Sequence, residues 1–121
     1  RAGKLLITQR LADAHLGGLW EFPGGKREAD ESFEHCLARE LREELGVTVG
    51  VGELFEEITH HYPEKSVHLK FFLCRLLDGE PRPVGCAAVA WIDCAGLDAY
   101  EFPAADAHLL ERIRLTPGLW Q

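Results

Sequence analysis

Three glutamates in one short segment are the residues of this chain whose types and spacing best suit chemistry. Glu40, Glu43 and Glu44 lie in a stretch with helical character, where residues three or four positions apart are neighbours. Their carboxylates would repel one another by about 0.2–0.5 kcal/mol per pair, and a hard dication would turn that penalty into binding energy. Mg²⁺ prefers oxygen ligands and usually binds through one or two carboxylates plus substrate phosphates. The spacing indicates a magnesium site, and the alternative is a solvated acidic helix face.

A helix must position these carboxylates. Glu31 and Ser32 provide a capping-type entry, no proline interrupts residues 32 to 45, and Gly46 supplies a C-terminal stop. The apolar residues that recur every four positions, and that we expect to face the core, are Phe33, Leu37, Leu41 and Leu45.

The spacing around the glutamates resembles the Nudix box. Gly25 is followed after five residues by Glu31, and seven residues later by Arg-Glu-Leu-x-Glu-Glu-x-Gly-Val at 39–47. The flanks are similar to the MutT-like branch of that family, and the quoted segments are Thr8-Gln9-Arg10, Ala12-Asp13-Ala14-His15, Glu21-Phe22-Pro23-Gly24-Gly25-Lys26 and Phe102-Pro103-Ala104-Ala105-Asp106. This resemblance covers nearly the whole chain. It implies an α/β/α sandwich with a mixed sheet and Mg²⁺-dependent hydrolysis of a nucleoside triphosphate, most simply 8-oxo-dGTP, to a monophosphate and pyrophosphate, with Mn²⁺ as a substitute metal.

The resemblance also assigns site residues. Glu40, Glu43 and Glu44 would be the catalytic and metal-binding carboxylates, and a backbone carbonyl at Gly24 or Gly25 would complete the metal shell. The residues that would contact the nucleotide are Arg10, His15, Glu21, Phe22, Lys26 and Asp106. Arg39 would hold a glutamate in position, either through a helix-surface ion pair with Glu43 or as a stronger support of the metal ligands, and Glu31 would be architectural.

One departure from the family pattern concerns the catalytic base. MutT-like enzymes carry a further glutamate just before the tryptophan of a later strand, but Ala90 occupies the matching position here. No carboxylate lies between Glu80 and Asp93. Either Glu40 or Glu43 takes the proton, or catalysis is slower than in relatives that have the extra glutamate.

A second departure concerns the base of the nucleotide. Where MutT has an asparagine, this chain has Asp106, and an ionised aspartate only accepts hydrogen bonds. It would favour the N–H groups of guanine or the amine of cytosine, so CTP or 5-methyl-dCTP pyrophosphohydrolysis is the alternative activity. A helix N-cap is the structural alternative for Asp106. A remoter alternative is a non-catalytic 8-oxoguanine-binding module, which would not need the complete box.

Composition bounds the remaining possibilities. A chain of 121 residues predicts one α+β domain over 1–121. The family resemblance also implies a further strand segment before residue 4, which we expect to lie in N-terminal residues outside the given sequence. The net charge of -7 disfavours nucleic acid as a partner, and no apolar run approaches the ~20 residues of a membrane helix. We therefore expect a monomeric cytoplasmic protein that acts on a free nucleotide. The cysteines are expected to be reduced and buried, above all Cys36 and Cys74.

The remaining elements follow from the alternation of apolar and polar residues and from the positions of turn residues. We expect strands over 4–8, 47–61, 67–77 and 87–93, and over 20–26 a short strand that runs into a glycine turn. We also expect a short helical connection over 97–100 and a second helix over 104–115.

Overall fold

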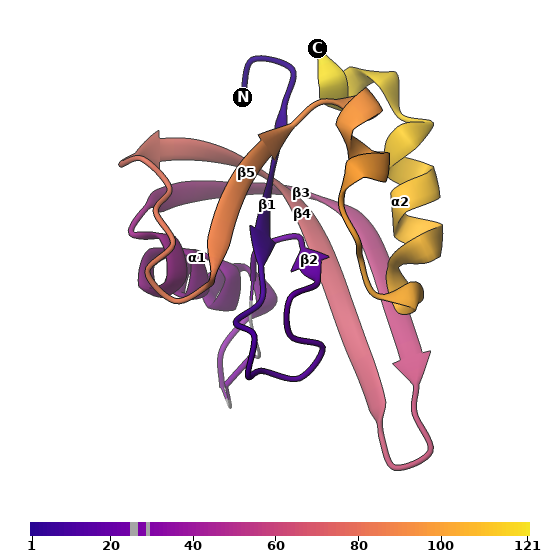
Figure 1. Cartoon of the computed structure of the whole chain (residues 1–121). Coiled ribbons are helices and arrows are strands. Elements are labelled where there is room, and N and C mark those ends of the chain that lie inside the picture. Colours follow the sequence, from indigo (N-terminus) through magenta and orange to yellow (C-terminus); the bar gives the residue numbers. More distant parts are fainter. Residues whose placement is uncertain (25–26, 29) are drawn as a thin grey trace. The chain divides into compact units, whose positions relative to one another are not determined.

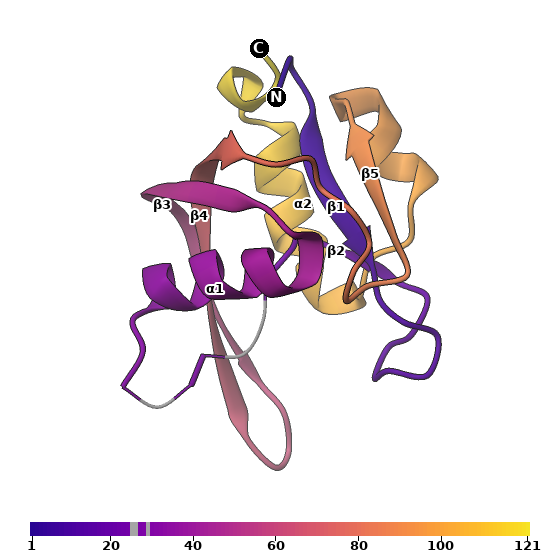
Figure 2. The same ribbon diagram turned by 90° about the vertical axis from the view of Figure 1, so that its left-hand side faces the viewer.

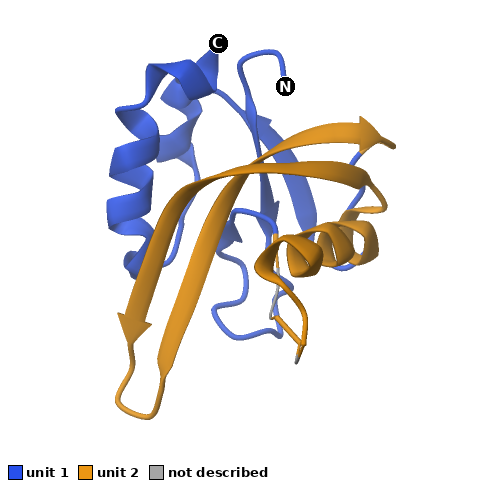
Figure 3. Cartoon of the chain, turned by 180° about the vertical axis from the view of Figure 1, so that it is seen from behind, with its two compact units in different colours: residues 1–23, 81–121 blue, residues 24–80 orange. Residues whose placement is uncertain are grey.

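The computed structural model describes residues 1–24, 27–28 and 30–121, which form two compact units (Figure 3). Unit 1 comprises residues 1–23 and 81–121, and unit 2 comprises residues 24–80. Each unit contains one α-helix and antiparallel strands, so the predicted α+β class is confirmed. Every strand pair found among the described residues is antiparallel, where the family resemblance led us to expect a mixed sheet.

The helix of unit 2, α1 (Phe33–Leu45), begins and ends as its sequence predicts. The Ser32 hydroxyl accepts a hydrogen bond from the His35 backbone N–H at 3.0 Å, and Gly46 closes the helix in the left-handed conformation at φ 71°. Of the predicted apolar stripe, Leu41 and Leu45 are buried, while its first two members are half-buried. The stripe therefore faces the core most fully in the second half of α1, where the glutamates lie.

Strands β3 (Thr48–His61) and β4 (Ser66–Asp78) form a long antiparallel hairpin against which α1 packs (Figure 2). Their register shifts between Val51 and Leu54, which marks a β-bulge. A Cβ on Gly52 would lie 2.6 Å from the Leu73 carbonyl oxygen, so only glycine fits this close approach.

Unit 1 is built on a three-stranded sheet in the order β2 (Trp20–Glu21), β1 (Leu5–Gln9), β5 (Ala88–Ile92), shown in Figure 1. The predicted helix over 104–115 is two pieces, a 3₁₀ turn (Ala104–Asp106) followed by α2 (Ala107–Arg114). Further 3₁₀ turns span Cys94–Ala99 and Pro117–Trp120. The buried apolar residues of this unit are Ile7, Cys86, Ile92, Leu97, Leu109 and Ile113.

The prediction that the cysteines are buried holds for Cys36 and Cys86, but Cys94 is only half-buried and the prediction is wrong at Cys74. All four cysteines are free, and Cys36 is buried, but Cys74 is exposed. Its apolar neighbours on β4 predict a buried strand, yet a sheet of only two strands leaves part of each strand uncovered. Among the described residues, no helix has both the length and the apolar character needed to cross a bilayer.

Candidate metal and nucleotide sites

In unit 2, a single arginine gathers the carboxylates of the α1 region. Arg39 binds Glu31 through two hydrogen bonds, Nε to Oε2 at 2.6 Å and Nη2 to Oε1 at 3.0 Å. Its Nη1 also donates to Glu40 Oε1 at 3.0 Å and to Glu43 Oε2 at 3.1 Å. A guanidinium presents five donors in a rigid fork, and bidentate pairs with carboxylates are among the stronger hydrogen bonds. Arg39 therefore holds two of the three predicted metal-binding glutamates in fixed orientations.

Glu31 is the firmest partner in this network. Its side chain is only 10% exposed, and its Oε1 also accepts from the Glu28 backbone N–H at 3.0 Å. The two hydrogen bonds from Arg39, aided by that backbone bond, lower the pKa of Glu31 from 4.5 to about 2. In return, Glu31 above all raises the pKa of Arg39. Glu31 thus anchors the arginine that contacts Glu40 and Glu43.

The metal-binding potential of unit 2 depends on carboxylates that project from α1. Hard oxygen donors of this type fit Mg²⁺. Arg39 contacts one oxygen of Glu40 and one of Glu43, so each carboxylate has a second oxygen that Arg39 does not hold. In the part of the chain that the structure describes, three His, Cys, Asp or Glu side chains do not converge as a ready metal cage. This donor set suits a cation that is bound partly by substrate phosphates rather than by protein alone.

The loop before α1 contains further predicted site residues. Gly24 lies against α1, because a Cβ placed on it would contact Leu37 Cδ1 at 3.6 Å. Leu37 itself lies one helical turn before Glu40 and Leu41. Gly25 and Lys26 lie outside the described residues, so the carbonyl assigned to Gly25 and the substrate contact assigned to Lys26 stay predictions.

In unit 1, the end of β1 brings together three of the residues predicted to contact the nucleotide. Arg10 Nη1 pairs with Glu21 Oε1 at 2.8 Å, and Arg10 Nε donates to the His15 carbonyl oxygen at 2.6 Å. The side chains of Arg10 and Glu21 are 31% and 28% exposed. Arg10 is thus fixed by two partners just after the end of β1, the middle strand of the sheet, and its bond to the His15 carbonyl holds the loop that carries His15.

Aromatic contacts connect β2 to the segment that precedes α2. The Trp20 backbone N–H donates to the Glu101 carbonyl at 2.8 Å, and the Trp20 and Tyr100 rings meet edge to face. Phe22, which we expected to lie against the base, stacks on Phe102 with ring centroids 5.6 Å apart. Sequence reasoning did not assign Phe102 a role, although it opens the Phe-Pro-Ala-Ala-Asp segment. The stack offers a flat apolar surface of the kind that accommodates a nucleobase.

Asp106 lies at the end of this aromatic connection. It occupies the N-cap position of α2, but its side chain makes no capping hydrogen bond, so the structure does not support the N-cap alternative. Within the described part of the chain, its half-buried carboxylate has no hydrogen bond or ion pair. Burial, and after it the negative charge of Glu21, raise the pKa of Asp106 above its ordinary 3.8. This carboxylate is therefore available to a ligand.

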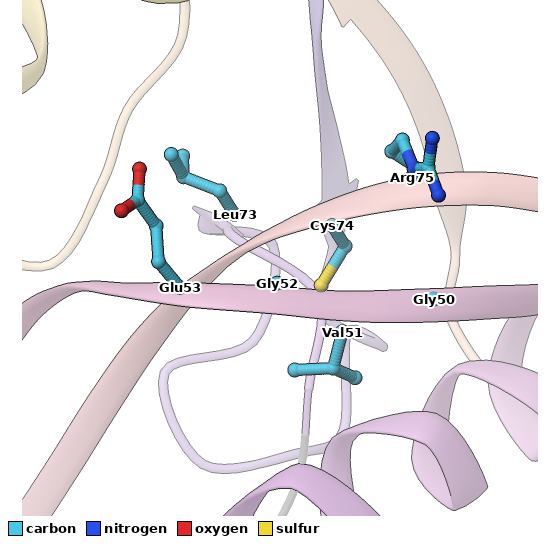
Figure 4. Close-up of a pocket in the computed structure, with 7 residues that line it drawn as sticks. All are labelled: Gly50, Val51, Gly52, Glu53, Leu73, Cys74 and Arg75. Carbon is cyan, nitrogen blue, oxygen red and sulfur yellow. The ribbon is translucent and has the colours of Figure 1, made fainter.

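Two other regions bear on the predicted chemistry. Ala90 lies in the middle of β5 opposite Ile7, so unit 1 offers no carboxylate at the position where MutT-like enzymes have their further glutamate. In unit 2, a shallow cavity of about 340 Å³ beside the bulge is lined by Gly50, Val51, Gly52, Glu53, Leu73, Cys74 and Arg75 (Figure 4). None of the residues predicted to act on a nucleotide lines it.

The sequence of this chain is similar to those of known proteins. The family model described as the NUDIX domain matches residues 1–112. The 8-oxo-dGTP diphosphatase of Escherichia coli K12 is 36% identical over 111 residues, which cover 92% of this chain and 86% of that protein. The CTP pyrophosphohydrolase of the same organism is 38% identical over 109 residues, which cover 90% and 79% of the two chains.

Solved structures agree with this relationship. A MutT structure from work on the Aliivibrio salmonicida and Vibrio cholerae proteins superposes with a TM-score of 0.78 at 32% identity, covering 95% of this chain and 87% of the other. A family model that spans most of the sequence and a shared fold over nearly its full length lead to one conclusion. This chain belongs to the Nudix hydrolase family, in its MutT-like branch.

Proposed function

We propose that this chain is a nucleoside triphosphate pyrophosphohydrolase that removes 8-oxo-dGTP from the nucleotide pool by converting it to 8-oxo-dGMP and pyrophosphate. The observation that carries the proposal is the Arg39 network, in which one guanidinium orients Glu40 and Glu43 on the helix of the Nudix box. The relationship to the E. coli 8-oxo-dGTP diphosphatase supports the choice of substrate.

Nudix hydrolases generally depend on a divalent metal, and here Glu40, Glu43 and Glu44 with the Gly24 carbonyl would hold Mg²⁺, or Mn²⁺ in its place. When bound, the metal would neutralise phosphate charge and lower the pKa of a water. The remaining contributions come from the chain itself. Arg39 keeps Glu40 and Glu43 oriented, and one of them accepts the proton of the attacking water. Ala90 cannot do so, which leaves the box glutamates as the candidate bases.

In unit 1, we assign recognition of the nucleoside to five residues: Arg10, His15, Glu21, Phe22 and Asp106. The Phe22 ring would cover a face of the base, while Glu21 and Asp106 offer carboxylates to its hydrogen-bonding edge. Lys26 would contact the phosphates. We further propose that the enzyme is monomeric and cytoplasmic and acts on free nucleotides.

A second candidate function is CTP or 5-methyl-dCTP pyrophosphohydrolysis. Two observations favour it. The Asp106 carboxylate has no partner within the described chain, so it can accept a hydrogen bond from the cytosine amine, and the E. coli CTP pyrophosphohydrolase is a relative of similar identity. Unpaired buried polar groups are costly, so this one residue can shift specificity strongly.

Pyrophosphate release from 8-oxo-dGTP, dGTP, CTP, 5-methyl-dCTP and ADP-ribose, measured with Mg²⁺ and with EDTA, tests the proposal. We expect Mg²⁺-dependent turnover with the highest kcat/KM for 8-oxo-dGTP. A preference for cytosine nucleotides would replace the first function with the second. Absence of turnover on every nucleotide would contradict both and would identify Ala90 as a disabling loss.

A further inference from the structure

Thr8 has the least favourable polar environment among the described side chains. Its side chain lies in the middle of the sheet of unit 1, the residue is 1% exposed, and its hydroxyl oxygen is buried with no hydrogen-bond partner among the described residues. A buried hydroxyl without a partner costs about 1–3 kcal/mol, and most such groups in native proteins are satisfied. Valine has the same shape and would avoid this cost, so the hydroxyl requires an explanation.

The strand register places Thr8 beside the residues assigned to nucleoside recognition. Thr8 is directly opposite Glu21 in the β1–β2 ladder, and directly opposed residues project from the same face of a sheet with Cβ atoms about 4.5–5.5 Å apart. Arg10, the first residue after β1, pairs with Glu21 and therefore lies close to this carboxylate. Ile7, by contrast, projects from the opposite face and belongs to the core.

Glu21 has an acceptor to offer. Arg10 occupies its Oε1, while its Oε2 has no hydrogen bond within the described part of the chain. A carboxylate can accept about four hydrogen bonds, so Oε2 can accept one from the Thr8 hydroxyl and still accept another from a ligand. A buried donor and an unused acceptor are thus carried by two directly opposed residues of the β1–β2 ladder.

We propose that Thr8 is a positioning residue for base recognition, whose hydroxyl donates to Glu21 when a nucleotide binds and so fixes this carboxylate against the base. The inference rests on the proposed function, because it takes Glu21 to contact the nucleoside. The unpaired hydroxyl of the free protein is then a group whose partner comes into position with the ligand. Thr8 itself need not touch the substrate.

The test uses Thr8→Val, which removes only the hydroxyl, and Thr8→Ser, which retains it. The measurements are the Kd of the nucleoside monophosphate product of the preferred substrate, by calorimetry without divalent metal, the separate values of kcat and KM, and the Tm. For Thr8→Val we expect Kd and KM to rise about tenfold, the size of a hydrogen bond to a charged group, with kcat within about twofold and no fall in Tm. Thr8→Ser should restore Kd to within about threefold. Thr59→Val, an exposed threonine on β3, is the control that should change nothing.

Weaker binding of the monophosphate without a fall in Tm distinguishes this positioning role from a role in packing, which would lower the Tm as well. If Thr8→Val binds the monophosphate as tightly as the wild type, the inference is wrong. It is equally wrong if both variants weaken binding together with a lower Tm, because that pattern indicates lost packing. A wild-type protein that binds no nucleoside monophosphate would overturn the proposed function itself, and the role of Thr8 with it.

Discussion

The carboxylate clusters of the two units differ in how completely their charges are paired. In unit 2, Arg39 is hydrogen-bonded to three glutamates, and the firmest of them, Glu31, has a pKa of about 2. In unit 1, Arg10 pairs with a single carboxylate, Glu21, and Asp106 nearby has no partner within the described chain. The first cluster is preorganised before any ligand arrives, as the positioning of catalytic groups requires, whereas the second retains unused hydrogen-bonding capacity, as recognition requires.

The largest effect should follow from altering the preorganised cluster at a reacting carboxylate. Glu43→Gln keeps the shape and the side-chain oxygen of Glu43 but removes its charge, so kcat should fall about 10²–10⁴-fold while Tm changes little at this 58% exposed position. Steady-state pyrophosphate release measures the loss. Glu34→Gln, an exposed change on the same helix, is the control, and undiminished kcat in Glu43→Gln would remove this residue from the proposed mechanism.

A smaller loss of kcat should follow when Arg39, which orients the carboxylates, is changed instead of a carboxylate itself. Arg39→Lys keeps the charge but cannot reproduce the bidentate bond to Glu31 or the simultaneous contacts with Glu40 and Glu43. We expect kcat to fall about 10–100-fold, with a lower Tm because Glu31 and Glu40, which are largely shielded from solvent, lose hydrogen bonds. Arg42→Lys, at an exposed position of α1, should match the wild type. Equal kcat in the two variants would show that the network is not needed for turnover.

In unit 1, a change at Asp106 should alter the preference between substrates more than the rate of turnover. Asp106→Asn supplies a donor and an acceptor together, so the ratio of kcat/KM for 8-oxo-dGTP over CTP should rise about tenfold. Glu101→Gln, an exposed change in the same segment, is the control. An unchanged ratio would show that Asp106 does not contact the base.

The raised pKa of Asp106 predicts that its ionised form destabilises the folded state. Because the folded state binds the proton more tightly than the unfolded state, ionised Asp106 costs stability as the pH rises through the folded-state pKa. Asp106→Asn should therefore have a higher Tm than the wild type near neutral pH, and the gain should disappear below about pH 3.8. A gain that is independent of pH would point to a cause other than this carboxylate.

The pairing of Glu31 has a second effect on stability, with the opposite dependence on pH. Arg39 lowers the pKa of Glu31 from 4.5 to about 2, so the ionised carboxylate stabilises the folded state above pH 4.5 and loses that effect as the pH falls towards 2. Urea unfolding of the wild type and Glu31→Gln should show the wild type more stable at about pH 6, and the difference should shrink below pH 4.5. A constant difference across this range would contradict the ion-pair explanation.

The sequence predicted local features well because their causes are local. Ser32, Gly46 and the four-residue apolar spacing were enough to place α1, and its bounds agree. Helical spacing also predicted the Arg39–Glu43 pair, but not the stronger bond to Glu31, because the loop before α1 brings that residue back to the helix.

Features that depend on distant segments could not be predicted in the same way. The charge of Glu21 acts on Asp106, 85 positions later, because a backbone hydrogen bond and two aromatic contacts join β2 and Phe22 to the segment before α2. The buried hydroxyl of Thr8 and the exposure of Cys74 likewise depend on which strands cover them. The alternation of apolar and polar residues along a strand assigns each residue to one of two faces, but it does not say which face other elements of the fold cover.

We propose that the two units divide the labour, with unit 2 carrying turnover and unit 1 carrying recognition of the nucleotide. One measurement tests it directly: kcat/KM for 8-oxo-dGTP and for CTP, with Mg²⁺, in Glu43→Gln and Asp106→Asn side by side. We predict that Glu43→Gln lowers both values by the same large factor and leaves their ratio unchanged, while Asp106→Asn changes the ratio and keeps the value for 8-oxo-dGTP. A changed ratio in Glu43→Gln, or an equal loss on both substrates in Asp106→Asn, would contradict the claim.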